Sequence, residues 1–172
     1  MQKITPFIWF EKGAEEAAKF YVDVFNGSPG KRKRSQITSG LDYEENSAAA
    51  SGMPEGSVLT VGLELDGAGF TFLNGGKVDW MNPSGRISFV IDCADQAEVD
   101  YFWKKLGEEG GEPGQCGWIN HDKYGVTWQI TPSGMFEYLG GKDKAGADRA
   151  MKAMLSMTKL DLAKIKAAYE GK

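Results

Sequence analysis

The apolar positions of the chain follow two spacings, and these predict strands and helices in a fixed order. Residues 4–10 are apolar and aromatic without clean alternation, which predicts a strand buried on both faces. Apolar residues recur at helical spacing over 14–25, with charged residues between them, and predict a helix. Three strands are predicted next, the last two joined by an Asp-Gly hairpin turn, at residues 31–38, 58–65 and 70–73.

The same order then begins again. Residues 85–91 predict a strand, and Asp95 followed three residues later by Glu98 predicts the capped start of a helix. Residues 115–120 and 125–131 predict a closing hairpin. The buried stripe of the second helix is expected to consist of Val99, Phe102, Trp103 and Leu106.

Two phrases support this repetition. The segments 66–72 and 122–128 both read Asp, two residues, Gly, apolar, Thr, aromatic, and they lie 56 positions apart (122 − 66). Phe7-Ile8 matches Phe89-Val90 at a spacing of 82 positions (89 − 7). The chain therefore predicts two related modules, about 1–78 and 84–135, with 26 extra residues (82 − 56) in the first.

Two segments fall outside the repeat. Residues 39–55 are polar and predict a long loop, which is either a lid or a mobile insertion. Residues 148–157, and those that follow 158–161, have helical apolar stripes that must cover the body or a second subunit. The expected organisation is a single α+β domain over 1–140 with a C-terminal helical extension over 141–172.

Composition narrows the classes of function. The chain has 172 residues, 41% of them hydrophobic and 26% charged, and a net charge of −4, which argues against a nucleic-acid binder. It contains no apolar run long enough to span a bilayer and no signal-peptide pattern, so a cytoplasmic protein without membrane contact is expected. Two cysteines and a single histidine, His121, fit neither a disulfide framework nor a zinc site.

Several phrases together resemble one known family. They include Ile4-Thr5-Pro6-Phe7-Ile8-Trp9-Phe10, Phe72-Leu73-Asn74-Gly75-Gly76, Ile87-Ser88-Phe89, Cys116-Gly117-Trp118 and Asp122-Lys123-Tyr124-Gly125. With the repeat, these phrases resemble the PhnB-like branch of the vicinal oxygen chelate superfamily, which includes glyoxalases, bleomycin-resistance proteins and extradiol dioxygenases. The resemblance implies two βαβββ modules that form a cupped mixed sheet, and a homodimer with the C-terminal helices near the interface or wrapped around the body.

Members of this branch often carry the label 3-demethylubiquinone-9 3-methyltransferase-like, and the residues do not support methyl transfer. A methyltransferase of the common nucleotide-binding type needs a glycine-rich turn between its first strand and helix. Here that turn reads Glu11-Lys12-Gly13. We therefore expect neither S-adenosylmethionine nor another cofactor.

The resemblance also implies where metal ligands would stand. The final ligand position, typically Glu, falls on Gln129, and its partner in the first module falls on Leu73. The opening-strand position falls on Thr5 or Pro6, and the fifth-strand position near Arg86. None is His, Asp or Glu, the usual ligands of such ions, so no metal site is expected.

Strand alternation suggests what the cup could bind. Gln129, Thr127 and Thr131 share one face, while Phe72 and Trp128 should pack under the helices. An inward arginine with amide and hydroxyl groups would suit an anionic or oxygen-rich small molecule, with Trp80 and Trp118 near the rim. The candidate ligand-binding residues are Thr5, Thr71, Asn74, Arg86, Ser88, Trp118, Thr127 and Gln129, and no catalytic residue is assigned.

Three functions remain open from the sequence. The first is a metal-free small-molecule binder. The second is a lyase, isomerase or oxygenase with an atypical or weak metal site. The third is an interaction protein whose dimer surface matters more than its cavity. The missing His and Glu ligands favour the first over the second.

Overall fold

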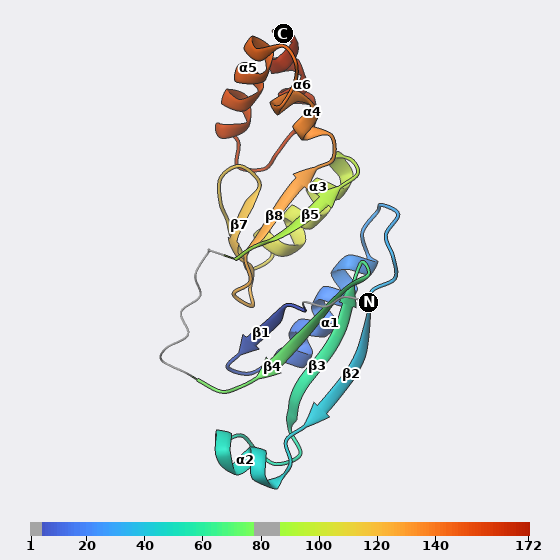
Figure 1. Ribbon diagram of the computed structural model, residues 1–172, viewed down its shortest axis with the longest axis vertical. Coiled ribbons are helices and arrows are strands. Elements are labelled where there is room, and N and C mark those ends of the chain that lie inside the picture. Colours follow the sequence, from blue (N-terminus) through green and yellow to red (C-terminus); the bar gives the residue numbers. More distant parts are fainter. Residues whose placement is uncertain (1–4, 78–86) are drawn as a thin grey trace. The chain divides into compact units, whose positions relative to one another are not determined.

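A computed structural model describes residues 5–77 and 87–172 and divides the chain into two compact units, Met1–Asn82 and Pro83–Lys172, called module one and module two here. Each module contains one four-stranded mixed sheet (Figure 1).

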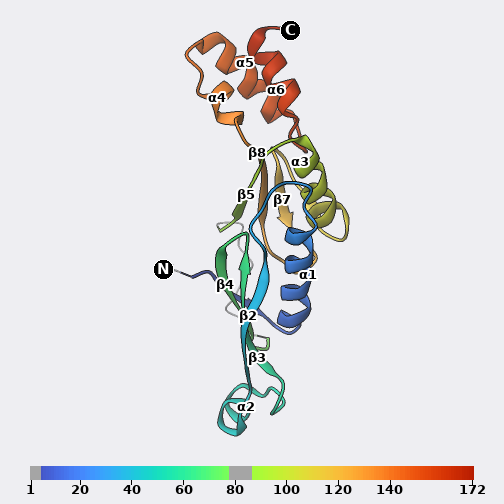
Figure 2. The same cartoon turned by 90° about the vertical axis from the view of Figure 1, so that its right-hand side faces the viewer.

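Module one has the predicted order of elements, with one additional helix, α2. Its sheet has the strand order β1-β4-β3-β2, in which β1 runs parallel to β4 and the other neighbours are antiparallel. Helix α1 lies along one face of this sheet, and no other helix of module one covers the opposite face in the described residues (Figure 2). The elements are β1 (Phe7–Phe10), α1 (Ala14–Asn26), β2 (Gln36–Asp42), α2 (Glu45–Ser51), β3 (Val58–Leu65) and β4 (Ala68–Asn74).

Module two repeats this topology. Its sheet has the order β5-β8-β7-β6, again with a parallel pair, β5 and β8, followed by antiparallel neighbours. The two modules are therefore pseudo-symmetric, which confirms the predicted α+β fold of paired βαβββ units. The elements are β5 (Phe89–Cys93), α3 (Gln96–Phe102), the π-helix η1 (Trp103–Glu108), β6 (Glu112–Pro113), β7 (Trp118–His121) and β8 (Trp128–Pro132).

The cores form where the helices meet the sheets. In module one the buried ring of Tyr21 on α1 stands edge-on to Phe72 on β4, with their centroids 5.7 Å apart. In module two the predicted stripe of the second helix is buried, and so is Trp128 on β8. The Asp95 side chain accepts a hydrogen bond from the Glu98 amide at 3.0 Å, so the predicted helix cap is confirmed.

The opening strand differs from its prediction. We expected residues 4–10 to be buried on both faces, but β1 is an edge strand and Phe7 is 60% exposed. The aromatic run is nevertheless explained by a sheet in which α1 covers only one face. Phe10 packs under that helix, whereas Phe7 and Trp9 lie on the opposite, open face with their β4 partners Thr71 and Leu73.

The predicted match between Phe7 and Phe89 is wrong by one residue. Ile8 pairs with Phe72 in module one, whereas Phe89 pairs with Trp128 in module two, so Ile8 and Phe89 are equivalent. Phe89 stacks against Trp128 with a centroid distance of 5.5 Å. The helices keep the spacing of 82 residues, so the one-residue difference arises in the strand pairing.

The segment 39–55 is also more regular than predicted. The third strand begins at Gln36 rather than Lys31, and it continues to Asp42, inside the segment expected to be a loop. Helix α2 follows, and the Glu44 amide donates to the Ser47 hydroxyl at its N-terminal capping box. Tyr43 fixes this insertion to β4, because its hydroxyl donates to the Asn74 carbonyl at 2.6 Å.

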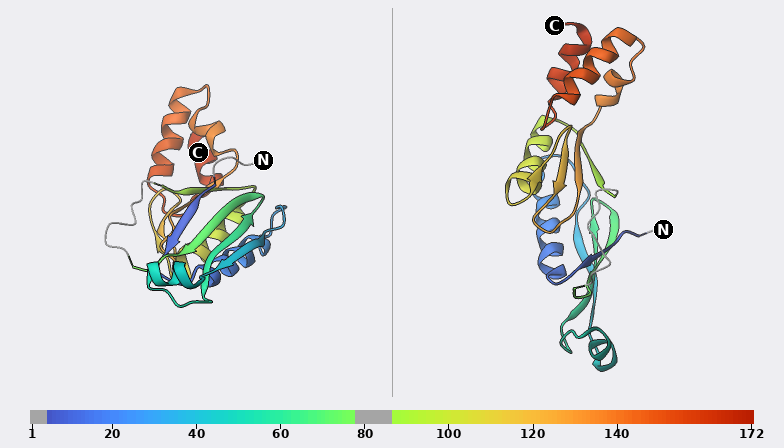
Figure 3. Two further views of the ribbon diagram at one scale, coloured as in Figure 1. Left: turned by 60° about the horizontal axis from the view of Figure 1, so that its bottom comes forward. Right: turned by 90° about the vertical axis from the view of Figure 1, so that its left-hand side faces the viewer.

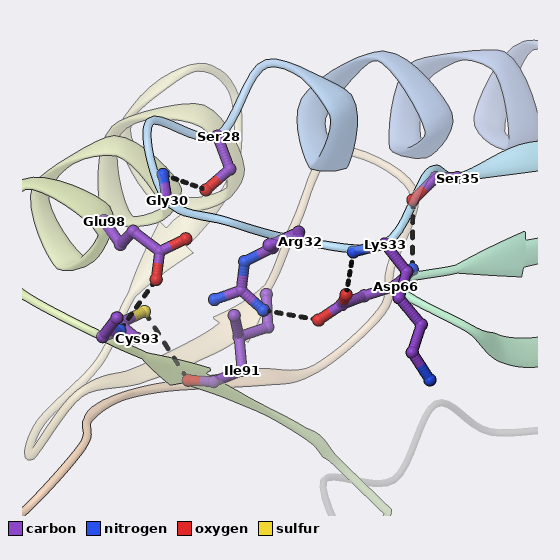
Figure 4. Close-up of polar contacts among 10 residues, drawn as sticks. Ser28, Gly30, Arg32, Lys33, Ser35, Asp66, Ile91, Cys93 and Glu98 are labelled. Carbon is purple, nitrogen blue, oxygen red and sulfur yellow. Dashed lines mark hydrogen bonds and ion pairs between the residues drawn. The ribbon is translucent and has the colours of Figure 1, made fainter.

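The repeated Asp phrase forms two different turns. Asp66 and Gly67 both have positive φ (49° and 84°) and make a two-residue hairpin, in which the Asp66 carboxylate accepts from the Lys33 amide and from Arg32, both at 2.8 Å (Figure 4). Asp122 starts a longer loop and is only 1% exposed. The shared sequence pattern therefore describes equivalent strands but not equivalent turns.

Three C-terminal helices follow the module-two sheet and pack against one another (Figure 3). They are α4 (Met135–Leu139), which was not predicted, α5 (Lys144–Leu155) and α6 (Leu162–Glu170). Their core combines Met135, Ala150, Leu160 and Ile165. The segment between α5 and α6 is tied to module two, since the Cys116 amide donates to the Met157 carbonyl and Gln96 donates to the Leu160 carbonyl.

Candidate functional site

The open face of the module-two sheet brings together several predicted ligand-binding residues. Along β8, Trp128 and Ile130 are buried, while Gln129 between them points to the opposite face and is half-buried. This alternation follows from the two-residue period of a strand. The predicted orientation of Gln129 is therefore the one observed.

Two neighbours complete this part of the sheet. Gln129 pairs with Val90 on β5, and its side-chain Nε2 donates a 2.8 Å hydrogen bond to the hydroxyl of Ser88. On its other side Gln129 pairs with Trp118 of β7, and the Trp118 side chain is half-buried. Paired residues carry their side chains on the same face, about 5 Å apart at Cβ. We call the surface formed by Ser88, Val90, Trp118, Thr127 and Gln129 the Gln129 face.

Thr127 lies at one end of this face, directly before β8. Its hydroxyl donates to the backbone carbonyl of Asn120 at 2.8 Å. The hydroxyl hydrogen is thereby engaged, and the oxygen keeps its capacity to accept a hydrogen bond.

In module one, the open face is mostly apolar. Thr71 and Leu73 point to this face with their partners Phe7 and Trp9 of β1, as the alternation along β4 predicts. The Trp9 indole donates to the Gly76 carbonyl at 2.9 Å, which fixes the ring at the end of the sheet. Sequence reasoning missed Trp9, although its parity with Phe7 along the first strand would have shown that both share a face.

Thr5 is exposed and stands just before β1. The carbonyl of the next residue, Pro6, accepts a hydrogen bond from the Thr71 amide at 3.0 Å, so the start of β1 is aligned with β4 at this point. Thr5 therefore belongs to the sheet of module one and not to the Gln129 face.

Asn74 has a structural position in the core. It is 5% exposed, and its Oδ1 accepts from the Ala14 amide at 2.8 Å, at the first turn of α1. Its Nδ2 donates to the Glu15 carboxylate at 2.6 Å and to the Val58 carbonyl at 3.0 Å. The N-cap residue Gly13 has no side chain to do this, so Asn74 caps the helix from another strand. Both of its N–H hydrogens are engaged within the protein.

Arg86 and Trp80 lie outside the described residues, and so does the predicted inward arginine contact. Of the eight predicted ligand-binding residues, the sheet of module two brings together Ser88, Trp118, Thr127 and Gln129. Thr71 belongs to the other sheet.

The positions that the resemblance assigned to metal ligands remain without strong donors. Gln129 and Leu73 both lie on open sheet faces, as that assignment requires, but they supply one neutral amide and one alkyl group. Within residues 5–77 and 87–172, no group of three or more His, Cys, Asp or Glu side chains gathers where it could hold a metal ion.

The single histidine belongs to a neighbouring pair of strands. His121 Nε2 lies 3.1 Å from Glu112, its cross-strand partner, and both side chains are more than half exposed. The Asn120 amide, which donates to Glu112, and the charge of His121 lower the pKa of the Glu112 carboxyl. This exposed pair links β6 to β7.

Asp122 organises the loop that leads into β8. Its carboxylate accepts from the Tyr124 amide, the Val126 amide and the Trp128 indole, at 2.8 to 3.0 Å. These bonds fix the start of β8 and thereby the position of Gln129. Asp122 thus has a structural function that residue type alone did not reveal.

Comparisons with known proteins agree with this architecture. A family model described as 3-demethylubiquinone-9 3-methyltransferase matches residues 2–131. A solved structure of a PhnB protein from Bacillus cereus, which carries that same enzyme name provisionally, is 30% identical, covers 77% of this chain and 100% of its own, and has a TM-score of 0.61.

A solved structure from Pseudomonas aeruginosa is 16% identical, covers 77% of this chain and 98% of its own, and has a TM-score of 0.54, which shows a similar fold. No curated protein matches the chain. None of the helices in the described ranges is long and apolar enough to cross a membrane.

Proposed function

Because this chain belongs to the 3-demethylubiquinone-9 3-methyltransferase family, the PhnB-like branch of the vicinal oxygen chelate superfamily, we propose that it binds a small molecule without a metal ion, on the Gln129 face. Residues 1–140 act as the ligand-binding domain, and residues 141–172 as its helical extension.

The observation that supports this most is the hydrogen bond between Gln129 and Ser88. The two residues are 41 positions apart in the sequence, yet the parallel pairing of β5 and β8 joins them on an open sheet face. An amide held by a hydroxyl next to a half-buried indole combines oriented polar groups with an aromatic surface. Small-molecule sites are typically built from such apolar walls with a few oriented polar groups.

The proposal of a metal-free site follows from the chemistry of the donors. A divalent ion on this sheet would need imidazole or carboxylate ligands, and the matching positions carry Gln129 and Leu73. After purification without chelators, elemental analysis should find well under one metal ion per chain. About one ion per chain, lost in Gln129→Leu, would overturn this part of the proposal.

Methyl transfer is not proposed, despite the family's name. A nucleotide-type cofactor would need the backbone amides at the turn between β1 and α1. In this chain the Asn74 side chain accepts the Ala14 amide at the start of α1. Titration calorimetry with S-adenosylmethionine should show no binding, and stoichiometric binding would reject this conclusion.

The ligand can be captured from a mixture and then identified by its mass. The protein is incubated with a small-molecule extract of the cells that express it, desalted, and measured by native mass spectrometry. Wild type should retain a bound mass, and Gln129→Leu, which keeps the side-chain size, should lose it. Gln36→Leu is the matched control, because Gln36 is an exposed amide on β2 that donates to Glu64. Equal retention by wild type and Gln129→Leu would contradict the proposed site.

We also propose a cytoplasmic homodimer, with the C-terminal helices near the interface. Met151 and Leu155 on α5 are large apolar residues that are exposed in the single chain, which supports a contact there. Light scattering at micromolar concentration should give twice the mass of one chain. A monomeric mass would reject the dimer and leave the ligand-binding proposal unaffected.

A further inference from the structure

The Gln129 face has an unequal supply of hydrogen-bond acceptors and donors. The Nε2 of Gln129 is bound to Ser88, and within the described residues this is the one hydrogen bond of the Gln129 side chain. Its carbonyl oxygen Oε1 is consequently the end of the amide that can receive a ligand. Because the Ser88 hydroxyl fixes the amide, this acceptor is oriented before a ligand arrives.

Thr127 adds a second acceptor. Its hydrogen is donated to the Asn120 carbonyl, so a ligand meets the lone pairs of the hydroxyl oxygen. The Ser88 hydroxyl, which accepts from Gln129, is the donor on this face. Two oriented acceptors therefore stand beside one donor.

Charge points in the same direction. Across the described β5, β7 and β8, no lysine or arginine is present, and the charged residue that shares this face is an acid, Asp92, paired with Thr131. An anion would therefore find neither a cation nor a row of donors on these strands. Trp118, next to Gln129, offers an aromatic surface for a planar group.

From these observations we infer that the Gln129 face selects planar ligands with an N–H donor group, such as an amide or amidine, over planar anions. The inference rests on the proposed function and deepens it. It differs from the expectation of an anionic ligand, which depended on Arg86. The Gln129 carbonyl receives the donor, and the ring of the ligand lies on Trp118.

Three probes of one shape test this class. Benzamide, benzamidine and benzoate share a phenyl ring and differ in the polar group, which is a neutral donor, a cationic donor and an anionic acceptor. Each is titrated into the full-length protein labelled with 15N. The indole signal of Trp118 and the side-chain amide signal of Gln129, identified by substitution, report binding.

We expect benzamide and benzamidine to shift both signals with a Kd about tenfold or more below that of benzoate, since an unmatched buried acceptor costs roughly that factor. Gln129→Leu should weaken benzamide about tenfold, while Gln129→Glu should strengthen benzamidine and weaken benzoate by similar factors. Gln36→Leu should change none of the three Kd values.

The outcomes separate the donor preference from the site itself. If benzoate binds as tightly as benzamide and loses affinity in Gln129→Leu, the donor preference is wrong and the site stands. If no probe shifts either signal at millimolar concentration, the inference and the proposed function are both rejected. If Gln129→Leu loses its folded far-ultraviolet spectrum, Gln129→Glu decides the preference, and unchanged affinities in that variant would reject it.

Discussion

Asn74 offers the sharpest test of whether a predicted ligand residue belongs to the site or to the core. The sequence places it at the rim of a binding site, but the structure shows it capping α1 from the end of β4. Replacing it with alanine removes the acceptor of the Ala14 amide and leaves that amide and the Val58 carbonyl without their partner. The two interpretations predict opposite results for the same substitution.

The expected loss follows from these contacts. A lost N-cap acceptor costs about 1 kcal/mol, and a buried carbonyl left without its partner costs about 1–3 kcal/mol. The small cavity in a site that is 5% exposed adds to this cost. Asn74→Ala should therefore lower the free energy of unfolding of module one by about 3 kcal/mol.

The assay must report module one itself, because the chain has two compact units that need not unfold together. Amide hydrogen exchange of α1, measured alongside urea unfolding, meets this requirement. Asn120→Ala is the matched control, since Asn120 is an exposed amide that donates to Glu112. It should cost less than about 1 kcal/mol.

Unchanged exchange of the α1 amides in Asn74→Ala would refute the capping role. Wild-type stability combined with a loss of ligand binding would refute it too, because this is the behaviour of a rim residue. Asn74→Asp adds a second criterion. It keeps an acceptor for the Ala14 amide but places a carboxylate against that of Glu15, 2.6 Å from the present Nδ2, so it should destabilise α1 as well.

Three further predictions concern module two and the strand register. Asp122→Ala should lower the unfolding free energy by about 3 kcal/mol or more, measured by urea unfolding, because three buried donors lose their acceptor; a loss below about 1 kcal/mol would contradict this function. The hydrogen bond from Lys159 lowers the pKa of Asp100, so the pair stabilises the fold above the ordinary carboxyl pKa and ceases to do so as pH falls through the lowered value. Asp100→Asn should cost up to about 1 kcal/mol at neutral pH and nothing in strong acid, and a loss that is the same under both conditions would argue against the ion pair. Phe89→Ala should cost about 2 kcal/mol and Phe7→Ala less than about 1 kcal/mol, and equal losses would restore the register that the sequence predicted.

The duplicated architecture could be predicted because the signals behind it are local. Helical spacing placed α1 to within one residue, and Asp95 marked the start of α3 through a cap that spans three residues. The alternation along β8 likewise indicated the orientation of Gln129. Each of these depends on neighbours within one element.

What could not be predicted depends on partners from elsewhere in the chain. The capping of α1 by Asn74 joins residues 60 positions apart, and nothing near either residue indicates it. The identical Asp phrases gave no warning that one carboxylate would bind Arg32 and the other a buried indole. Helix α2 was missed because its seven residues bury little besides Ala48, so the apolar pattern was too weak to show a helix.

The two sheets share a topology, so the residues that differ at equivalent positions carry the information about function. The pairing places Trp9 beside Leu73 in module one, and Val90 beside Gln129 in module two. By the same register, Phe7 corresponds to Ser88, the hydroxyl that fixes the Gln129 amide. The first open face is thus apolar where the second is polar. A repeat that explains the scaffold therefore cannot explain the site, because the Ser88–Gln129 pair has no counterpart at the equivalent positions of the described module one.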